Sequence, residues 1–137
     1  MAKNENDKKI RGFATLINSI LIPLNENKVF REKFKKKKGK ILLNASNLNY
    51  AALVVIENGI LKVTSIPNKP KSNLKKKVVG WNAFLEMDTQ TFLLLALNQI
   101  SPLVFLKKWL NHKIKIRGIL KLLLLFAIFK FLIDYKE

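Results

Sequence analysis

The sequence predicts an α+β fold, in which helices cover one face of a mainly antiparallel sheet of about five strands. Three observations support this prediction. Asn58-Gly59 separates two runs rich in β-branched residues within Tyr50–Ile66, which is the pattern of a β-hairpin. In His112–Arg117, isoleucines alternate with basic residues, as in a half-buried strand. Towards both ends of the chain, apolar residues recur at helical spacing.

The first part of the chain is expected to be helical up to the first strand. Apolar residues from Ile10 onward follow helical spacing until Pro23 ends the helix. A second, shorter helix is expected over Asn25–Phe34. The basic stretch that follows leads into an apolar strand at Lys40–Ser46, and the hairpin comes next.

The second part of the chain places helices between the last two strands. A loop rich in Pro and Lys, Pro67–Asn82, precedes a strand over Ala83–Asp88. Asp88 is a suitable N-cap for a helix over Thr89–Ile100, and Pro102 opens another short helix. The alternating strand then leads through a glycine into a final helix.

Composition and charge limit the classes of protein that need to be considered. The 137 residues suit one domain, which we place at residues 10–137 after a disordered polar tail over residues 1–9. Because 26 Lys and Arg face 9 Asp and Glu, the formal charge is +17, which favours polyanionic partners. The absence of Cys excludes disulfides and thiol chemistry. The polar start is unlike a secretory signal, so we expect a cytoplasmic protein. Its basic surface is compatible with peripheral association with membranes.

The final helix, Gly118–Ile133, is unusually apolar. A membrane span needs about 20 mostly apolar residues, whereas Lys121 and Lys130 interrupt this shorter helix on opposite sides. Because the helix is apolar nearly all round, it needs cover on several sides. A bound ligand or a partner is expected to provide part of that cover. A plain core helix and a membrane-anchored subunit are the alternatives.

The stretch from about Glu32 to Ile133 resembles the sterol carrier protein type 2 (SCP2) family of lipid-transfer domains. The matching pieces, in order, are "GKILLNA", "VVIENGILKV", "AFLEMDTQTFLLLALNQI" and "HKIKIRGILKLLL". The resemblance implies a five-stranded, mostly antiparallel sheet with a hydrophobic tunnel between the sheet and the C-terminal helix. In that family the tunnel takes sterols, fatty acyl chains or other lipids. The family often has an acidic residue after the glycine that opens the helix, where this chain has Ile119.

Eight apolar residues are expected to line the cavity, although each also suits an ordinary core. Three fall together on one predicted helix, and two phenylalanines share a face of the last helix. The candidates are Phe92, Leu95, Ala96, Ile114, Ile116, Leu122, Phe126 and Phe129.

Two lysine clusters are expected to contact an anionic membrane, although lysine-rich loops are often only solvated. The candidates are Lys35, Lys36, Lys37, Lys38, Lys75, Lys76 and Lys77. Nucleic acid is a further possible partner for basic clusters. However, nucleic-acid modules usually interleave aromatic residues with basic ones, and Trp81 and Trp109 lie only near the clusters.

The sequence does not point to catalysis. His112 is the only histidine and starts a predicted strand, and Asp88, which shares a strand face with Glu86, is explained as a helix cap. The sequence contains no Ser/His/acid set, phosphate-binding glycine loop or cluster of metal ligands. We therefore predict no catalytic residue, no metal and no cofactor other than a lipid ligand.

The leading hypothesis is a non-enzymatic lipid-binding and lipid-transfer protein. It would carry a sterol, a fatty acyl chain or a similar lipid in an internal cavity and dock transiently on anionic membranes. The alternative is a basic interaction module that binds nucleic acid or an acidic protein and has an ordinary packed core.

Overall fold

The computed structural model of the protein describes residues 12–96, 99 and 102–134. The predicted tail at residues 1–9 lies outside this description. In chain order the helices are α2 (Phe13–Leu21), the 3-10 helix η1 (Ile22–Glu26), α3 (Lys28–Lys33), the 3-10 helix η2 (Lys71–Leu74), α4 (Lys76–Val79), α5 (Thr89–Ala96), α6 (Pro102–Leu110) and α7 (Ile119–Asp134). The strands are β1 (Lys38–Ala45), β2 (Tyr50–Glu57), β3 (Ile60–Pro67), β4 (Ala83–Met87) and β5 (Lys115–Arg117).

The five strands form one sheet in the order β3-β2-β1-β4-β5. Neighbouring strands are antiparallel except for β1 and β4, which are parallel. The hairpin prediction is confirmed, because Asn58 and Gly59, with φ values of 56° and 78°, turn the chain between β2 and β3. The prediction of a mainly antiparallel five-stranded sheet with helices packed on it is confirmed as well.

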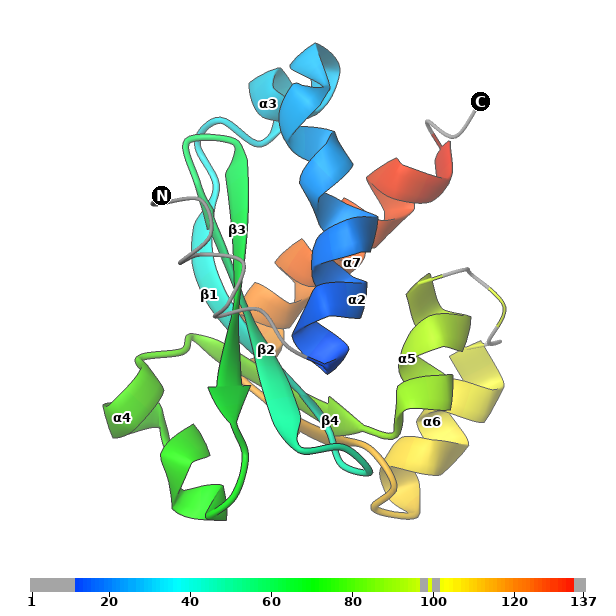
Figure 1. Cartoon of the computed structure of the whole chain (residues 1–137). Coiled ribbons are helices and arrows are strands. Elements are labelled where there is room, and N and C mark those ends of the chain that lie inside the picture. Colours follow the sequence, from blue (N-terminus) through cyan, green and yellow to red (C-terminus); the bar gives the residue numbers. More distant parts are fainter. Residues whose placement is uncertain (1–11, 97–98, 100–101, 135–137) are drawn as a thin grey trace.

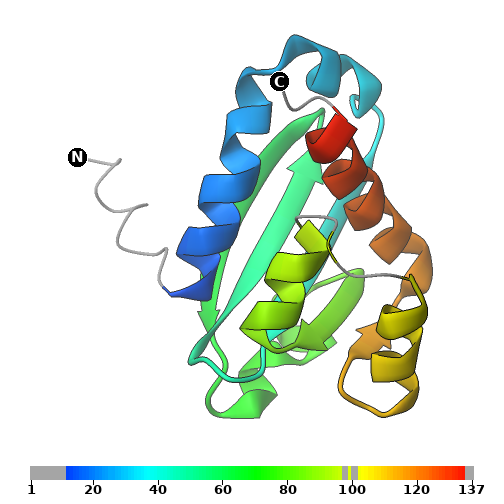
Figure 2. The ribbon, with the colours of Figure 1, turned by 90° about the vertical axis from the view of Figure 1, so that its right-hand side faces the viewer.

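Helices α2, α5 and α7 cover the same face of the sheet (Figures 1 and 2). The main core fills the space between them and the strands, and Ile41, Leu43 and Leu85 point into it without any exposed surface. Their partners on the helices include Phe13 and Leu125, which are also buried. Within the described ranges, no helix has both the length and the apolar composition that crossing a membrane requires.

The connection from β3 to β4 is more ordered than the predicted loop at Pro67–Asn82. It has to pass β2 and β1, and it does so through η2 and α4, which lie on the other face of the sheet (Figure 1). Leu74 is buried there in a small second cluster with Leu42 and Ala51. Trp81 Nε1 donates a hydrogen bond to the Leu74 carbonyl oxygen at 2.8 Å, which fixes the segment between η2 and β4. A short apolar anchor therefore orders a stretch whose composition suggested only a loop.

The last strand is shorter than predicted. We expected a strand over His112–Arg117, but His112 is exposed in a turn with φ 64°, and β5 begins at Lys115. The expected alternation survives in part, because Ile114 is buried and Ile116 half-buried while the basic residues between and after them are exposed. Pairing with β4 therefore begins only at Lys115, which lies opposite Glu86.

Gly118 fixes the entry into α7. Its φ is +68°, and a Cβ built at this position would collide with the carbonyl oxygen of Asn82 and lie 3.1 Å from the Cα of Ala83. Glycine is needed here for two reasons: the backbone is left-handed, and the start of β4 leaves no room for a Cβ.

The substitution Gly118→Ala is expected to lower the free energy of unfolding by about 2–4 kcal/mol, because it adds backbone strain to a collision with β4. Chemical denaturation followed by circular dichroism measures this loss. Gly80→Ala is the matched control, since Gly80 has φ +80° but the nearest atom to its built Cβ is Lys40 Nζ at 4.0 Å. The control should lose only about 1–2 kcal/mol, and equal losses would contradict the role of the collision.

Candidate functional site

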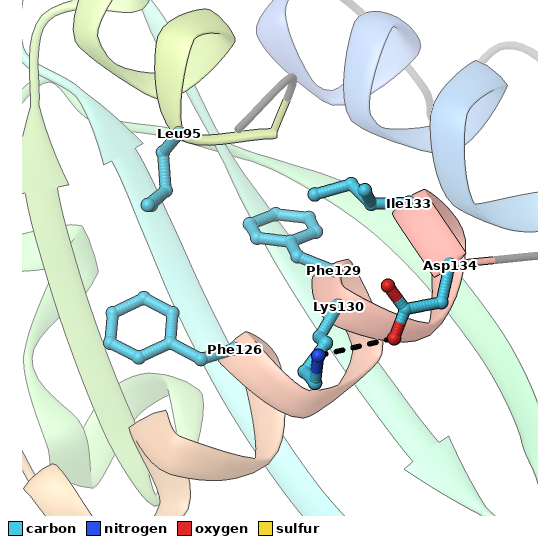
Figure 3. A pocket seen from close by; sticks show the side chains of 6 residues that line it. All are labelled: Leu95, Phe126, Phe129, Lys130, Ile133 and Asp134. Carbon is cyan, nitrogen blue, oxygen red and sulfur yellow. Dashed lines mark ion pairs between the residues drawn. The ribbon is translucent and has the colours of Figure 1, made fainter. Parts of the chain in front are cut away.

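A pocket of about 280 Å³ lies between α5 and α7 on the helical face of the sheet. Leu95 projects into it from α5 and faces the rings of Phe126 and Phe129 on α7 (Figure 3). Ile133 closes one side, and Lys130 and Asp134 complete the lining. The pocket therefore has apolar walls with two charged groups at its border.

The sequence of α7 builds one wall of this pocket through helical periodicity. Phe126, Phe129, Lys130 and Ile133 follow the i, i+3, i+4, i+7 pattern that puts side chains on one helix face. Beneath them, Leu125 and other buried residues of the same helix pack onto the sheet. One face of α7 thus serves the core and the adjacent face lines the pocket.

The two charged groups at the border are an ion pair within one helix turn. Lys130 Nζ lies 3.2 Å from Asp134 Oδ2, and the two side chains are 78% and 54% exposed (Figure 3). An exposed i,i+4 pair of this kind contributes only about 0.3–0.5 kcal/mol. The lysine can therefore exchange its partner for another anion at little cost.

The structure brings together three of the eight predicted cavity residues, Leu95, Phe126 and Phe129. Phe92 is buried in the core, where its ring packs 4.8 Å from that of Phe13, and Leu122 is also fully buried. Both side chains lie within the main core and do not border this pocket, so their role as cavity residues stays a prediction.

The remaining predicted cavity residues lie elsewhere or outside the description. Ile114 and Ile116 border a separate hollow of about 410 Å³ beside Trp109 and Leu110. Ala96 ends α5, and its side chain falls outside the described part of the chain. Sequence reasoning missed Lys130, Ile133 and Asp134, although the helical spacing of Lys130 and Ile133 from Phe126 and Phe129 was a usable signal.

The two predicted lysine clusters lie on different parts of the molecule. Lys35–Lys38 connect α3 to β1 and enter that strand, whereas Lys75–Lys77 lie at the start of α4, on the face of the sheet that the large helices leave open. Both clusters are exposed, as a membrane contact requires. Their role as membrane contacts stays a prediction.

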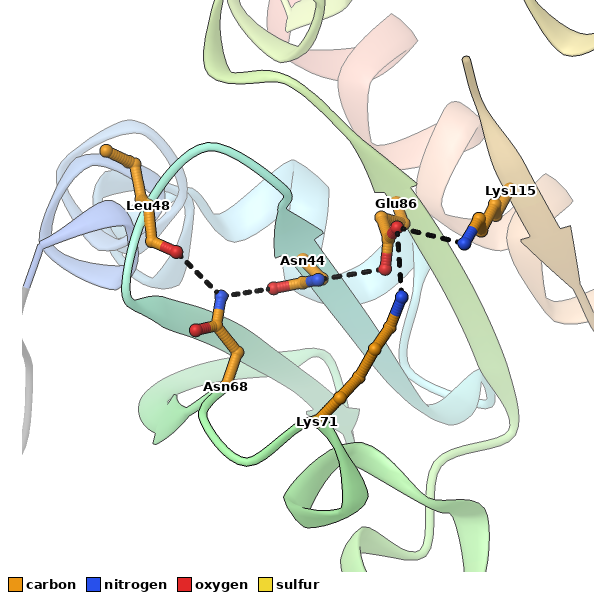
Figure 4. A network of polar contacts seen from close by, with 6 residues as sticks. All are labelled: Asn44, Leu48, Asn68, Lys71, Glu86 and Lys115. Atoms are coloured by element: carbon orange, nitrogen blue, oxygen red, sulfur yellow. Dashed lines mark hydrogen bonds and ion pairs between the residues drawn. The ribbon is translucent and has the colours of Figure 1, made fainter. Parts of the chain in front are cut away.

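The two carboxylates that share a predicted strand face do not form a catalytic pair. Glu86, only 8% exposed, accepts a hydrogen bond from Asn44 Nδ2 at 2.9 Å and lies 3.6 Å from the ammonium groups of both Lys71 and Lys115 (Figure 4). Asn68 extends this network by donating to Asn44 Oδ1 at 2.8 Å. The network ties β1, β4, β5 and η2 together, so Glu86 has a structural role.

The other carboxylate, Asp88, is the N-cap of α5, as predicted. The backbone N–H of Thr91 donates to Asp88 Oδ1 at 2.7 Å. This hydrogen bond is the main reason why the pKa of Asp88 lies below its ordinary value of 3.8, and the nearby charges of Lys108 and Lys113 act in the same direction. Among the described residues, no group of three or more His, Cys, Asp or Glu side chains is arranged to hold a metal ion.

Asp88→Ala should lower the free energy of unfolding by about 1 kcal/mol at neutral pH, because it removes the cap. The pKa of Asp88 is lower in the folded protein than in the unfolded chain. The stabilisation is therefore complete above the unfolded-state pKa and is lost as the pH falls through the folded-state pKa. Urea denaturation of both proteins over a pH series should show their difference shrinking below about pH 4.

Asp88→Asn is the matched control, since an uncharged amide keeps a cap acceptor without titrating. The difference between the Asn and Ala variants should not change with pH. A wild-type advantage that persists unchanged in acid would contradict the charged cap.

Comparison with family models and with curated proteins gives no match to this sequence. Solved structures do resemble the fold. A Thermus thermophilus protein, considered a possible sterol carrier protein, has a TM-score of 0.57 and 13% identity over 91% of this chain and 90% of that one. Sterol carrier protein 2 has a TM-score of 0.56 and 13% identity over 85% and 89%. The ubiquinone synthesis protein UbiJ-SCP2 has a TM-score of 0.53 and 11% identity over 88% of each chain.

A mutant of the sec-alkyl sulfatase PisA1 is also similar, with a TM-score of 0.56 and 13% identity over 79% of this chain. The chain spans only 14% of the length of that enzyme. At such low identities the likeness concerns the fold, and the three smaller proteins match it along nearly their whole length. The chain therefore has a sterol carrier protein 2-like fold.

Proposed function

We propose that the protein is a non-enzymatic carrier that binds a lipid in the pocket between α5 and α7. The observation that carries the proposal is a pocket that four apolar side chains line, with a loosely held cation at its border. The pocket lies between α5 and α7, two helices that cover the sheet, in a fold that resembles that of sterol carrier protein 2. Apolar walls with few polar groups are typical of lipid and small-molecule sites. The carrier delivers its lipid at the surface of anionic membranes, which its +17 charge attracts.

The size of the pocket favours a slim ligand. Pockets for drug-sized molecules usually have volumes of about 300–1,000 Å³, and this one, at about 280 Å³, falls just below that range. A single acyl chain fits such a volume better than a rigid fused-ring sterol. Each methylene that leaves water contributes about 0.8 kcal/mol before the costs of association, so a chain needs no other specific contact.

Lys130 supports an anionic headgroup. Its ammonium group lies at the border of the pocket, and Asp134, its partner 3.2 Å away, is exposed and weakly bound. A fatty-acid carboxylate or a lipid phosphate can take the place of Asp134 without leaving a buried charge unpaired. The ligand class that we propose is therefore an anionic single-chain lipid.

Delipidated protein should bind a fluorescent fatty acid saturably, and unlabelled fatty acid should displace it. Leu95→Trp fills the pocket and is expected to weaken this binding at least about tenfold, because the chain loses its methylene contacts. Leu53→Trp is the matched control, since Leu53 packs against the small cluster on the opposite face of the sheet. Absence of saturable binding in the unsubstituted protein, or equal weakening by both variants, would overturn the proposal.

Lys130→Gln tests the headgroup contact separately. It should weaken binding of a fatty-acid anion by about three- to tenfold and leave binding of the corresponding monoacylglycerol unchanged, because only the anion gains from the lysine charge. Competition titrations with the two lipids measure this difference. If the variant binds both lipids more weakly by the same factor, Lys130 does not contact the headgroup.

A second candidate function, nucleic-acid binding, is supported by one observation on the opposite face of the sheet. A hollow of about 320 Å³ there contains Trp81 and Phe84, whose ring centroids are 5.5 Å apart, bordered by Lys71, Lys75 and Arg117. The structure thus joins aromatic and basic groups that the sequence keeps apart, and bases stack on such surfaces. This function requires tight, steeply salt-dependent binding of a labelled single-stranded oligonucleotide, together with no lipid uptake.

A further inference from the structure

The outward face of α7 near its start is apolar and exposed. Leu120 is 80% exposed, Leu123 55% and Ile119 52%. The outer face of a surface helix is normally polar, and contiguous exposed apolar residues usually mark a binding surface. The core and the lipid pocket use other faces of the same helix, so neither accounts for these side chains.

This face borders a groove of about 540 Å³ between α7 and the segment that leads into β1. Apolar side chains of both segments line it, among them Phe34, Leu124 and Ala127. The two segments are in close contact, because Lys121 Nζ donates to the Lys38 carbonyl oxygen at 2.7 Å. A Cβ at Gly39 would lie only 3.3 Å from Leu124 Cδ2, so a small residue here allows the approach.

Among the described residues, the ionisable side chains that line the groove are all cationic: Lys36, Lys37, Lys38 and Lys121. Lys38 has an exposed partner, Glu57, at 3.7 Å, which lies outside the lining of the groove. The surface thus combines exposed leucines with adjacent lysines. An anionic bilayer offers matching chemistry, since its interface accepts apolar side chains and its headgroups attract lysines.

We infer that Ile119, Leu120 and Leu123 of α7, together with Lys36–Lys38, form the surface on which the protein docks on an anionic lipid bilayer. This inference rests on the proposed carrier function and chooses between the two predicted lysine clusters. Lys75–Lys77 adjoin Val78, which is 64% exposed but lies on a four-residue helix. The nearby rings of Trp81 and Phe84 are half-buried in their hollow, so this cluster lacks an apolar helix face that is as exposed as that of α7.

Co-sedimentation with vesicles tests the docking surface. The unsubstituted protein should bind vesicles of phosphatidylcholine mixed with phosphatidylglycerol and should bind pure phosphatidylcholine poorly. The double variants Leu120→Asp/Leu123→Asp and Lys36→Glu/Lys37→Glu should each weaken binding by about 10- to 100-fold. Val78→Asp and Lys76→Glu/Lys77→Glu are the matched controls and should weaken it less than about threefold.

Two readouts separate this inference from the carrier proposal. Fatty-acid loading without vesicles should be unchanged in Leu120→Asp/Leu123→Asp, which also shows that the variant is folded. If the unsubstituted protein fails to load lipid but vesicle binding follows the predicted pattern, the carrier proposal fails and the docking surface stands.

Three outcomes would overturn the docking surface. One is equal loss of vesicle binding in the test and control variants. Another is the absence of vesicle binding by the unsubstituted protein. The third is a concentration-dependent dimer in sedimentation velocity that Leu120→Asp/Leu123→Asp dissolves, because the face would then bind a second copy of the chain.

Discussion

The packing of α7 on the sheet is the interaction on which the rest of the structure depends. Leu122, Leu125 and Ile128 are fully buried in the core, and α7 contacts both β1 and β4. Burial of each such side chain contributes roughly 1.5–3 kcal/mol. The parallel pair β1 and β4 is the centre of the sheet, so one helix holds together the strands that join its two halves.

The same helix carries more apolar surface than the sheet can cover. One side of α7 packs in the core, a second lines the pocket opposite α5, and a third is exposed next to a lysine-rich segment. A sheet offers a flat surface to one side of a cylinder, so a helix that is apolar all round always keeps apolar area outside the contact. The pocket and the exposed face are therefore two consequences of one sequence property.

Charge is distributed so that two of the few acidic groups have structural roles. Glu86 links its own strand β4 to β1, β5 and η2 through Asn44 and two lysines, and Asp88 caps α5. Cations outnumber carboxylates so strongly, with a formal charge of +17, that most of them cannot have an acidic partner of their own. The two faces of the sheet nevertheless differ, because lysines adjoin exposed leucines near α7 and aromatic rings near η2.

The sequence by itself determined the fold class and most of the elements, though not the helices η2 and α4 or the start of β5, because periodicity and turn chemistry are local. Asn58-Gly59 specified the hairpin, Asp88 the start of α5, and Gly118 the entry into α7. Only the tertiary structure decided which apolar residues line the pocket. Phe92 and Leu95 are one helical turn apart, yet Phe92 packs on Phe13 while Leu95 faces α7.

That difference depends on where α2 and α7 lie relative to α5, which no local pattern contains. For the same reason, helical spacing places Lys130 on the same face as Phe126 and Phe129 but could not show that a pocket lies there, or that Lys36–Lys38 adjoin Leu120. Side-chain environments of this kind arise from contacts between segments far apart in the chain. Helical and strand periodicity reports only which side of its own segment a residue occupies.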